Sequence, residues 1–222
     1  MVDALPRAAA RRCSASGRGR IVTAVRPRLA ASERRASVLE VASRIFAKSS
    51  YRGTTTAEIA REAGVTEPIL YRHFESKRDL YLACLDDTWE RLHSRWEKAV
   101  ASEPDPKAWL AAMARAYLEA RGNVVLLADL WIQALAEAND DSVISSHLRQ
   151  QMKDVHRYVR DLICRSQAEG GILRERDADA EAWVFISIGV LGTVGRRLGG
   201  LIEDDLPRIK ASRREWMIGL GR

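Results

Sequence analysis

The residue types in this sequence that stand out for their chemistry are those that bind phosphate. Residues 1–30 contain seven arginines against one acid, Asp3, so this stretch carries a net charge of +6. Such a basic arm would neutralise phosphates and add a salt-dependent, sequence-independent term to binding. Thr55 and Thr56 stand where a helix is expected to begin, and hydroxyls and unpaired amides converge at such an end. Both features favour contact with a phosphate-rich polymer, although simple capping by the threonines is equally compatible.

Motifs of the common enzyme classes are missing from the sequence. It contains no GxxxxGK[ST], HExxH, GxSxG or CxxC pattern. The three cysteines, Cys13, Cys84 and Cys164, are far apart and odd in number, which is typical of a reducing cytoplasm and not of a disulfide framework or a zinc site. No stretch of 18 apolar residues is free of charge, so we expect no membrane span. We therefore expect a cytoplasmic protein that is not an enzyme and has no metal site or cofactor.

The elements that would position the threonines are two short helices in residues 54–77. Apolar residues repeat at helical spacing on both sides of Gly64, which stands where a left-handed residue would end the first helix. Thr55 with Glu58 forms a capping box, and Thr66 is expected to cap the second helix, with Pro68 in its first turn. This pattern predicts a helix-turn-helix. A further helix is expected to start at a third capping box beyond it.

The segments before this unit differ in character. Residues 1–30 are rich in Ala, Arg, Ser and Gly without periodicity, which predicts a disordered tail. A DNA-contacting arm, a solvated tail without a role and an overextended reading frame remain open, and a transit peptide has a similar composition. From residue 32 the pattern becomes helical, with Val38, Val41 and Ile45 on one face. This helix would support the two that follow.

Residues 34–85 resemble the DNA-binding domain of the TetR family of transcriptional regulators. The resemblance is an ordered set of positions over the whole segment, which is far more specific than a lone helix-turn-helix. The matching positions are Val41, Ala42, Ile45, Phe46, Tyr51, Gly53, Ile59, Ala60, Ala63, Gly64, Val65, Leu70, Tyr71, Arg72, His73, Phe74, Ser76, Lys77 and Leu80.

The resemblance implies roles for the second helix of the motif. Positions entering the major groove would be Glu67, Pro68, Ile69 and Arg72, and those contacting phosphate would be Tyr71, His73 and Lys77. Arg72 could reach guanine or a phosphate, and Glu67 could accept from cytosine or favour the helix dipole. The alternative for His73 is a solvated or packed side chain.

The remainder of the chain predicts a second helical domain. Trp109, Met113 and Tyr117 form one apolar stripe, and Leu127, Trp131 and Leu135 form another. In the family such helices enclose an effector pocket, and each stripe could be either pocket wall or plain core. The ligand-binding candidates are Trp109, Met113, Tyr117, Asn123, Trp131 and His147.

The last two helices are expected to form a dimer interface. The segment AWVFISIGVLGTVGRRL is apolar nearly all round and so requires burial on two sides. Its glycines would permit close approach of a partner helix, although a buried core helix within one chain is the alternative. The interface candidates are Trp183, Ile188, Gly192, Gly195, Trp216 and Leu220.

Together these patterns predict an all-α protein of about nine helices. We expect a disordered basic tail over residues 1–30, a helix-turn-helix DNA-binding domain over 31–90, and an effector-binding and dimerisation domain over 91–222. The resemblance implies a homodimeric repressor that binds a palindromic operator in double-stranded DNA and is released by a small, largely apolar effector. The alternative is a helix-turn-helix protein that binds DNA without a ligand. The sequence specifies neither the effector, nor the operator, nor the direction of control.

Overall fold

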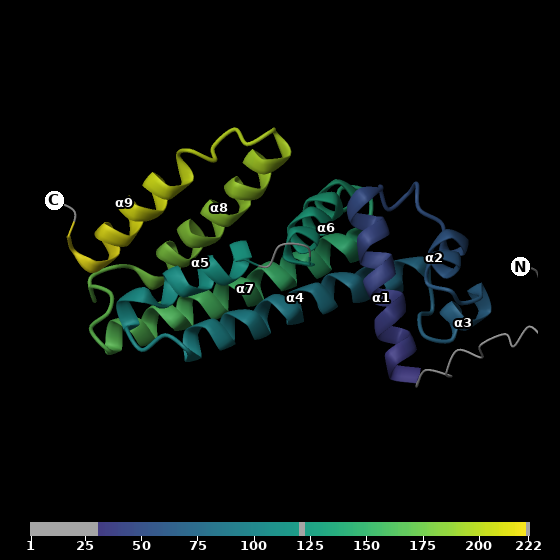
Figure 1. Ribbon diagram of the computed structural model, residues 1–222, viewed down its shortest axis with the longest axis horizontal. Helices are drawn as coiled ribbons and strands as arrows, with labels where there is room; N and C mark the ends of the chain where they lie inside the picture. The colour runs from purple at the N-terminus through teal and green to yellow at the C-terminus, as the bar shows by residue number, and fades with distance from the viewer. Residues whose placement is uncertain (1–30, 120–122, 221–222) are drawn as a thin grey trace, which may run out of the picture.

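The computed structural model describes residues 31–119 and 123–220, and the predicted tail over residues 1–30 lies outside them. The regular elements in the described ranges are all helical, as predicted. Figure 1 shows an elongated molecule in which three helices form one end, two long helices run through the middle, and the last two helices form the other end. The helices are α1 (Ala31–Lys48), α2 (Thr56–Glu62), α3 (Glu67–Tyr71), α4 (Lys77–Ala101), the 3-10 turn η1 (Pro106–Ala108), α5 (Trp109–Glu119), α6 (Asn123–Glu137), α7 (Ser142–Ala168), α8 (Ala178–Arg197) and α9 (Leu206–Ile218).

Local sequence signals account for the ends of the helix-turn-helix. The Thr55 hydroxyl accepts a hydrogen bond from the Glu58 amide at 3.2 Å, which caps α2 as predicted. Gly64 follows α2 with a φ of +68°, a conformation that glycine adopts without steric cost. The prediction for Thr66 was wrong in one respect, because it occupies the N-cap position of α3 but its side chain accepts no capping hydrogen bond.

A continuous apolar core joins the first three helices to the rest of the chain. Its N-terminal part is centred on Phe46, Leu70 and Tyr81, all buried, with the Phe46 and Tyr81 rings packed edge to face at 4.8 Å. The same cluster includes Leu130 of α6 and Ile144 of α7. The helix-turn-helix is therefore packed directly onto the base of the second half of the molecule.

The long helix α4 passes through both halves. It begins at Ser76, whose hydroxyl accepts from the Asp79 amide at 3.0 Å. Its N-terminal half contributes Leu80 and Leu85 to the first core, and its C-terminal half contributes Trp96 to a second core with Met113 of α5. Helix α4 is thus part of both cores.

Aspartate caps start the two helices that face each other across the second half. Asp141 accepts from the amides of Val143 and Ile144, and Asp177 accepts from those of Asp179 and Ala180. These caps mark the starts of α7 and α8. The two helices pack against each other.

Helix α8 is long and apolar, and only part of its surface is covered within the chain. By length and composition it would qualify as a membrane-crossing helix, a test that core helices of globular proteins also pass. Only 17% of the apolar window is buried within the chain, so a large apolar face remains open.

Candidate nucleic-acid interface and ligand cavity

Three predicted DNA-contacting side chains form a hydrogen-bonded cluster between α2 and α3. The Thr56 hydroxyl donates to a Glu67 carboxylate oxygen at 2.6 Å. The Thr56 and Tyr71 hydroxyl oxygens are 3.1 Å apart, which is within hydrogen-bonding distance. Thr56 therefore holds both the carboxylate and the phenol, and it does more than begin a helix. The pattern of residue types could not show this pairing, because it depends on how α2 and α3 pack against each other.

The remaining predicted positions lie around this cluster with different exposure. Tyr71 is 47% exposed, and Thr55, Pro68 and Arg72 are also exposed. Ile69 is half-buried. All of these residues come from α2, α3 or the residues that flank them.

His73 and Lys77 come after α3 in the chain and lie next to aromatic rings. The His73 ring is half-buried, with its centroid 6.4 Å from that of the core residue Phe74. The Lys77 ammonium lies 4.5 Å from the centre of the Tyr51 ring, a cation–π geometry. Burial lowers the pKa of Lys77, and Glu137 opposes this shift. Lys77 is therefore positioned by packing.

Charged contacts connect this unit to the turn between α6 and α7. Arg52 Nε lies 3.3 Å from Glu137, and the same guanidinium also contacts Asp140. Arg78 Nη1 lies 3.2 Å from Asp141, the N-cap of α7. Both arginines come from the helix-turn-helix half. These contacts therefore link that half to the α6–α7 turn.

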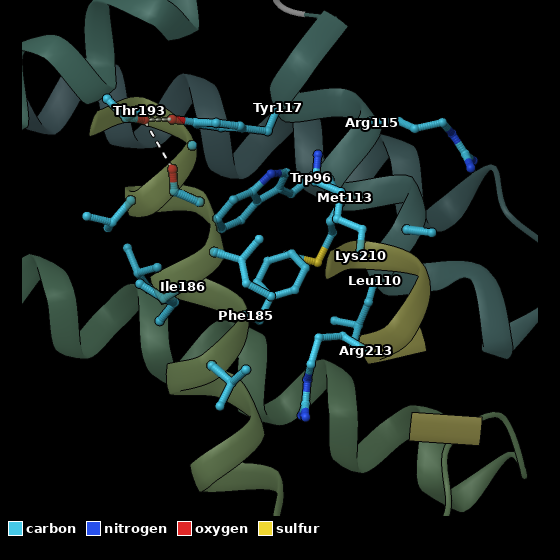
Figure 2. A pocket seen from close by; sticks show the side chains of 18 of the residues that line it. Trp96, Leu110, Met113, Arg115, Tyr117, Phe185, Ile186, Thr193, Lys210 and Arg213 are labelled. Carbon is cyan, nitrogen blue, oxygen red and sulfur yellow. Dashed lines mark hydrogen bonds between the residues drawn. The ribbon is translucent and has the colours of Figure 1, made fainter. Parts of the chain in front are cut away.

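The second half contains a cavity of about 470 Å³ with mostly apolar walls. This volume falls within the range of about 300–1,000 Å³ that is usual for small-molecule sites. Figure 2 shows the rings of Trp96 and Phe185 near its centre, with Tyr117 and Thr193 on one side and Lys210 and Arg213 of α9 on the other. Its walls come from α4, α5, α6, α7, α8 and α9.

The predicted ligand-binding residues divide into three groups. Met113, Tyr117 and Trp131 line the cavity. Trp109 does not, because it is buried in the core, where its indole N–H donates to the Glu103 carbonyl at 2.9 Å. His147 does not line the cavity either, and its Nε2 lies 2.8 Å from an Asp86 carboxylate oxygen. Asn123 begins α6, and its side chain lies outside the described part of the structure.

The cavity wall has few polar groups, and only some of them are hydrogen-bonded within the described residues. The Tyr117 and Thr193 hydroxyl oxygens are 2.9 Å apart, and Thr193 also donates to the Gly189 carbonyl (Figure 2). Burial raises the pKa of Tyr117. By contrast, Trp96 Nε1 and Gln151 Oε1 are buried without a hydrogen-bond partner among the described residues. Neither residue was predicted as a ligand contact, since an apolar stripe does not show which polar atoms are left unpaired.

The predicted dimer-interface residues also divide. Trp183, Trp216 and Leu220 are exposed apolar side chains, as an interface within a dimer would require. Ile188 and Gly192 line the cavity instead. A Cβ on Gly195 would lie 2.5 Å from Ile202 Cγ1, so the close approach that this glycine permits is made within the chain.

Comparisons with known proteins agree with this arrangement. Residues 38–84 match the family model of the bacterial regulatory proteins of the tetR family. The probable HTH-type transcriptional regulator ArpR of Pseudomonas putida is 31% identical over 184 residues, which covers 79% of this chain and 84% of ArpR. This chain belongs to the TetR family.

Two further comparisons give the extent of the similarity to other proteins. The HTH-type transcriptional activator FasR of Mycolicibacterium smegmatis is 38% identical over 92 residues, which cover 41% of the chain and 42% of FasR. A crystal structure of a TetR-family regulator from Rhodococcus sp. matches with a TM-score of 0.70 at 22% identity, and covers 85% of this chain and 96% of that one. This second match shows a shared fold. Members of the family are DNA-binding regulators and not enzymes.

Proposed function

We propose that this chain is a ligand-responsive transcriptional repressor that acts in the cytoplasm. It binds a palindromic operator as a homodimer and leaves the DNA when a small, largely apolar effector occupies the cavity. The observation that supports this proposal best is the continuity of α4, which begins beside the helix-turn-helix at Lys77 and ends in the cavity wall near Trp96. The boundaries 31–90 and 91–222 separate the DNA-binding and the effector-binding parts.

The DNA would be read by the exposed surface of α2 and α3. Pro68, Ile69 and Arg72 enter the major groove, while Tyr71, His73 and Lys77 contact phosphates along with Thr55 and Thr56. Glu67 enters the groove beside them. Because the Thr56 hydroxyl already donates to Glu67, this carboxylate is held in place and partly satisfied before DNA arrives. Tyr71 is 47% exposed and so is accessible to a phosphate.

A dimer would form through the open apolar face of α8 and α9. The exposed side chains of Trp183, Trp216 and Leu220 would be buried there, together with Leu191 and Leu198. In such a dimer the two α3 helices would be related by two-fold symmetry and lie about 34 Å apart. This spacing fits two half-sites that are one turn of DNA apart. An operator of this kind is palindromic.

Release would follow from a shift between two shapes. In one shape of the dimer the two α3 helices are farther apart and no longer match the half-sites. An effector that binds more tightly to this shape increases its population and so releases the DNA. The path from the cavity runs along α4 and through the α6–α7 turn, where Glu137 and Asp141 contact Arg52 and Arg78.

The test is selection of bound DNA from a random pool by the full chain. We expect enrichment of a palindrome, and Tyr71→Phe should weaken binding to it about fivefold by removing one phosphate hydrogen bond. Tyr158→Phe is the matched control, because Tyr158 packs against Trp96 and His93 in the second half. Equal loss in both variants would refute the assigned surface.

A second candidate function is DNA binding without a ligand. The seven arginines of residues 1–30 favour it, because they supply charge that does not depend on sequence. A steep salt dependence with no enriched sequence would establish this alternative and overturn the repressor. For the direction of control, a reporter fused to the selected operator should be repressed by the chain. Activation of that reporter would contradict this part of the proposal, and the FasR match makes the measurement necessary.

A further inference from the structure

The cavity wall has an excess of positive charge. Among the described residues that line it, six are cationic and Glu181 is the one acid. Charge of one sign around an apolar, partly enclosed space favours ligands of the opposite sign. The cations are Lys107, Arg115, Arg196, Lys210, Arg213 and Arg214.

Partners within the chain account for half of these cations. The pairs are Arg115 with Glu103 at 3.4 Å, Arg196 with Asp129 at 3.5 Å, and Arg213 with Glu181. Figure 2 shows the guanidinium of Arg115 pointing away from the cavity. Lys107 and Arg214 are exposed and therefore hydrated. Four of these five cations are paired or hydrated, whereas Arg196 Nη2 is buried without a hydrogen-bond partner among the described residues despite its ion pair with Asp129.

Lys210 differs from the other cations. It is half-buried on α9, and no ion pair or hydrogen bond of its ammonium is found among the described residues. Burial lowers the pKa of Lys210, with no opposing effect from a nearby carboxylate. An ammonium that is partly withdrawn from water without a counter-charge is costly unless an anion pairs with it.

Trp96 supplies a second, independent indication. Its side chain is 94% buried, since its relative exposure is 6%, and the indole N–H has no acceptor in the described chain. The indole nitrogen is a donor only, so it requires an oxygen or another acceptor. Its ring also stacks on Tyr158 at 5.9 Å, which fixes its orientation.

We propose that the effector is an amphipathic anion whose apolar body lies against Trp96 and Phe185, whose charged group pairs with Lys210, and which offers an oxygen to the Trp96 N–H. This inference rests on the proposed function only in treating the cavity as the effector site. A carboxylate on an apolar chain or ring meets all three conditions. A cationic amphiphile of the same size is disfavoured, because the wall has one acid, and that acid is already paired with Arg213.

The test compares three probes that share an apolar chain and differ in charge: decanoate, decanol and decyltrimethylammonium. Their binding to the full chain is measured by calorimetry at neutral pH, below the micellar concentration of each. We expect decanoate to bind about tenfold or more tightly than decanol, because a charge-assisted hydrogen bond is gained. Decyltrimethylammonium should bind more weakly than decanol.

The variants assign this preference to one side chain. Lys210→Met should abolish the advantage of decanoate over decanol, and Lys210→Arg should retain most of it. Lys107→Met is the matched control, since Lys107 lines the same cavity but is exposed. Trp96→Phe keeps an aromatic ring while removing the N–H, and it should weaken decanoate binding severalfold. Circular dichroism verifies that each variant is folded.

Several results would overturn the inference. These are equal binding of decanoate and decanol, a preference that survives Lys210→Met, or no binding of decanoate to the unmodified chain. Loss of the preference in Lys107→Met alone would move the anion site away from Lys210 and so contradict the proposal. Decanoate that binds through Lys210 without releasing operator DNA would refute the proposed regulation and leave the anion site standing.

Discussion

The Arg78 guanidinium, in the first turn of α4, lies 3.2 Å from the carboxylate of Asp141, the N-cap residue of α7. Asp141 accepts hydrogen bonds from Val143 and Ile144 with one oxygen and from Arg78 with the other. Burial is the largest single effect on Asp141 and raises its pKa, but the hydrogen bonds from Ile144, Arg78 and Val143 and the charge of Arg78 together hold this pKa below its usual value. One side chain thus starts a helix of the ligand-binding half and contacts the DNA-binding half.

Breaking this pair should destabilise the chain only modestly. We expect a coupling energy of about 0.2–1 kcal/mol in a double-mutant cycle of Arg78→Met and Asp141→Asn, because both side chains are partly exposed. Asparagine retains the capping oxygen, so the cycle isolates the charge pair. Urea denaturation at low and high salt measures it, and the coupling should shrink as salt rises. Arg157→Met with Asp154→Asn is the matched control, because this pair lies within α7 and does not join the two halves.

Lys77 should contribute charge and not sequence preference. Lys77→Met is expected to weaken binding to all DNA sequences similarly and to reduce the slope of log affinity against log salt by about one. Lys98→Met, at the far end of the same helix, should leave the slope unchanged. Fluorescence anisotropy over a salt series gives both slopes. A change in the preferred bases for Lys77→Met would instead show that this residue reads sequence.

Two glycines of α8 should respond in opposite directions to alanine. A Cβ on Gly195 would meet Ile202 at 2.5 Å, so Gly195→Ala should destabilise the fold by about 1–3 kcal/mol. No atom of the described residues lies within 4 Å of a Cβ on Gly189, so Gly189→Ala should stabilise the helix by up to about 1 kcal/mol. Thermal unfolding compares the two variants. If Gly189→Ala instead weakens the dimer in analytical ultracentrifugation, this position faces the partner subunit.

The two described cysteines should differ in reactivity. Burial raises the pKa of Cys84 to about 12, with a smaller opposing effect from Ser43, while Cys164 is exposed. Iodoacetamide should therefore alkylate Cys164 in the folded chain and Cys84 only in denaturant, as read by peptide mass spectrometry. Native labelling of Cys84 at the rate of Cys164 would contradict the buried placement.

Ionisation of the Cys84 thiol should lower the stability of the folded chain at high pH. In the unfolded chain the Cys84 thiol ionises near 9.0, whereas in the folded chain it keeps its proton up to about 12. The unfolded state therefore binds fewer protons between these values, so stability falls as pH rises through this window. Cys84→Ser introduces a hydroxyl that does not titrate in this window. This variant should therefore lose less stability between pH 8 and 10 than the unmodified chain does. The difference between the two losses should be below about 1.4 kcal/mol per pH unit, the limit for one proton. Urea denaturation at each pH measures the difference.

Much of the helix-turn-helix could be predicted because its signals are local. Capping residues such as Thr55, Ser76, Asp141 and Asp177 act within a few residues of themselves, so the sequence around them is enough to place a helix start. Thr66 shows the limit of such reasoning. It occupies the expected backbone position, but whether its hydroxyl makes the capping bond depends on a rotamer that spacing does not determine.

The cavity could be predicted only in part. Trp109, Met113 and Tyr117 are four residues apart, and each such step turns the helix by about 40°, so the stripe rotates by about 80° from end to end. Trp109 consequently packs into the core while Met113 and Tyr117 line the cavity. The sequence did not predict a role for Lys210 in the cavity, because this residue lies on the last helix among charged residues that are typical of a solvated face.

The sequence by itself determined the helices, their caps, the helix-turn-helix and membership of the family, since all of these depend on residues close together in the chain. Tertiary structure alone decided which buried polar atoms have no partner among the described residues, as at Trp96, and which glycine faces its own chain, as Gly195 does. It also decided that Lys210 lies in the cavity wall. These relationships join α4, α8 and α9, and their geometry follows from how the helices pack against one another.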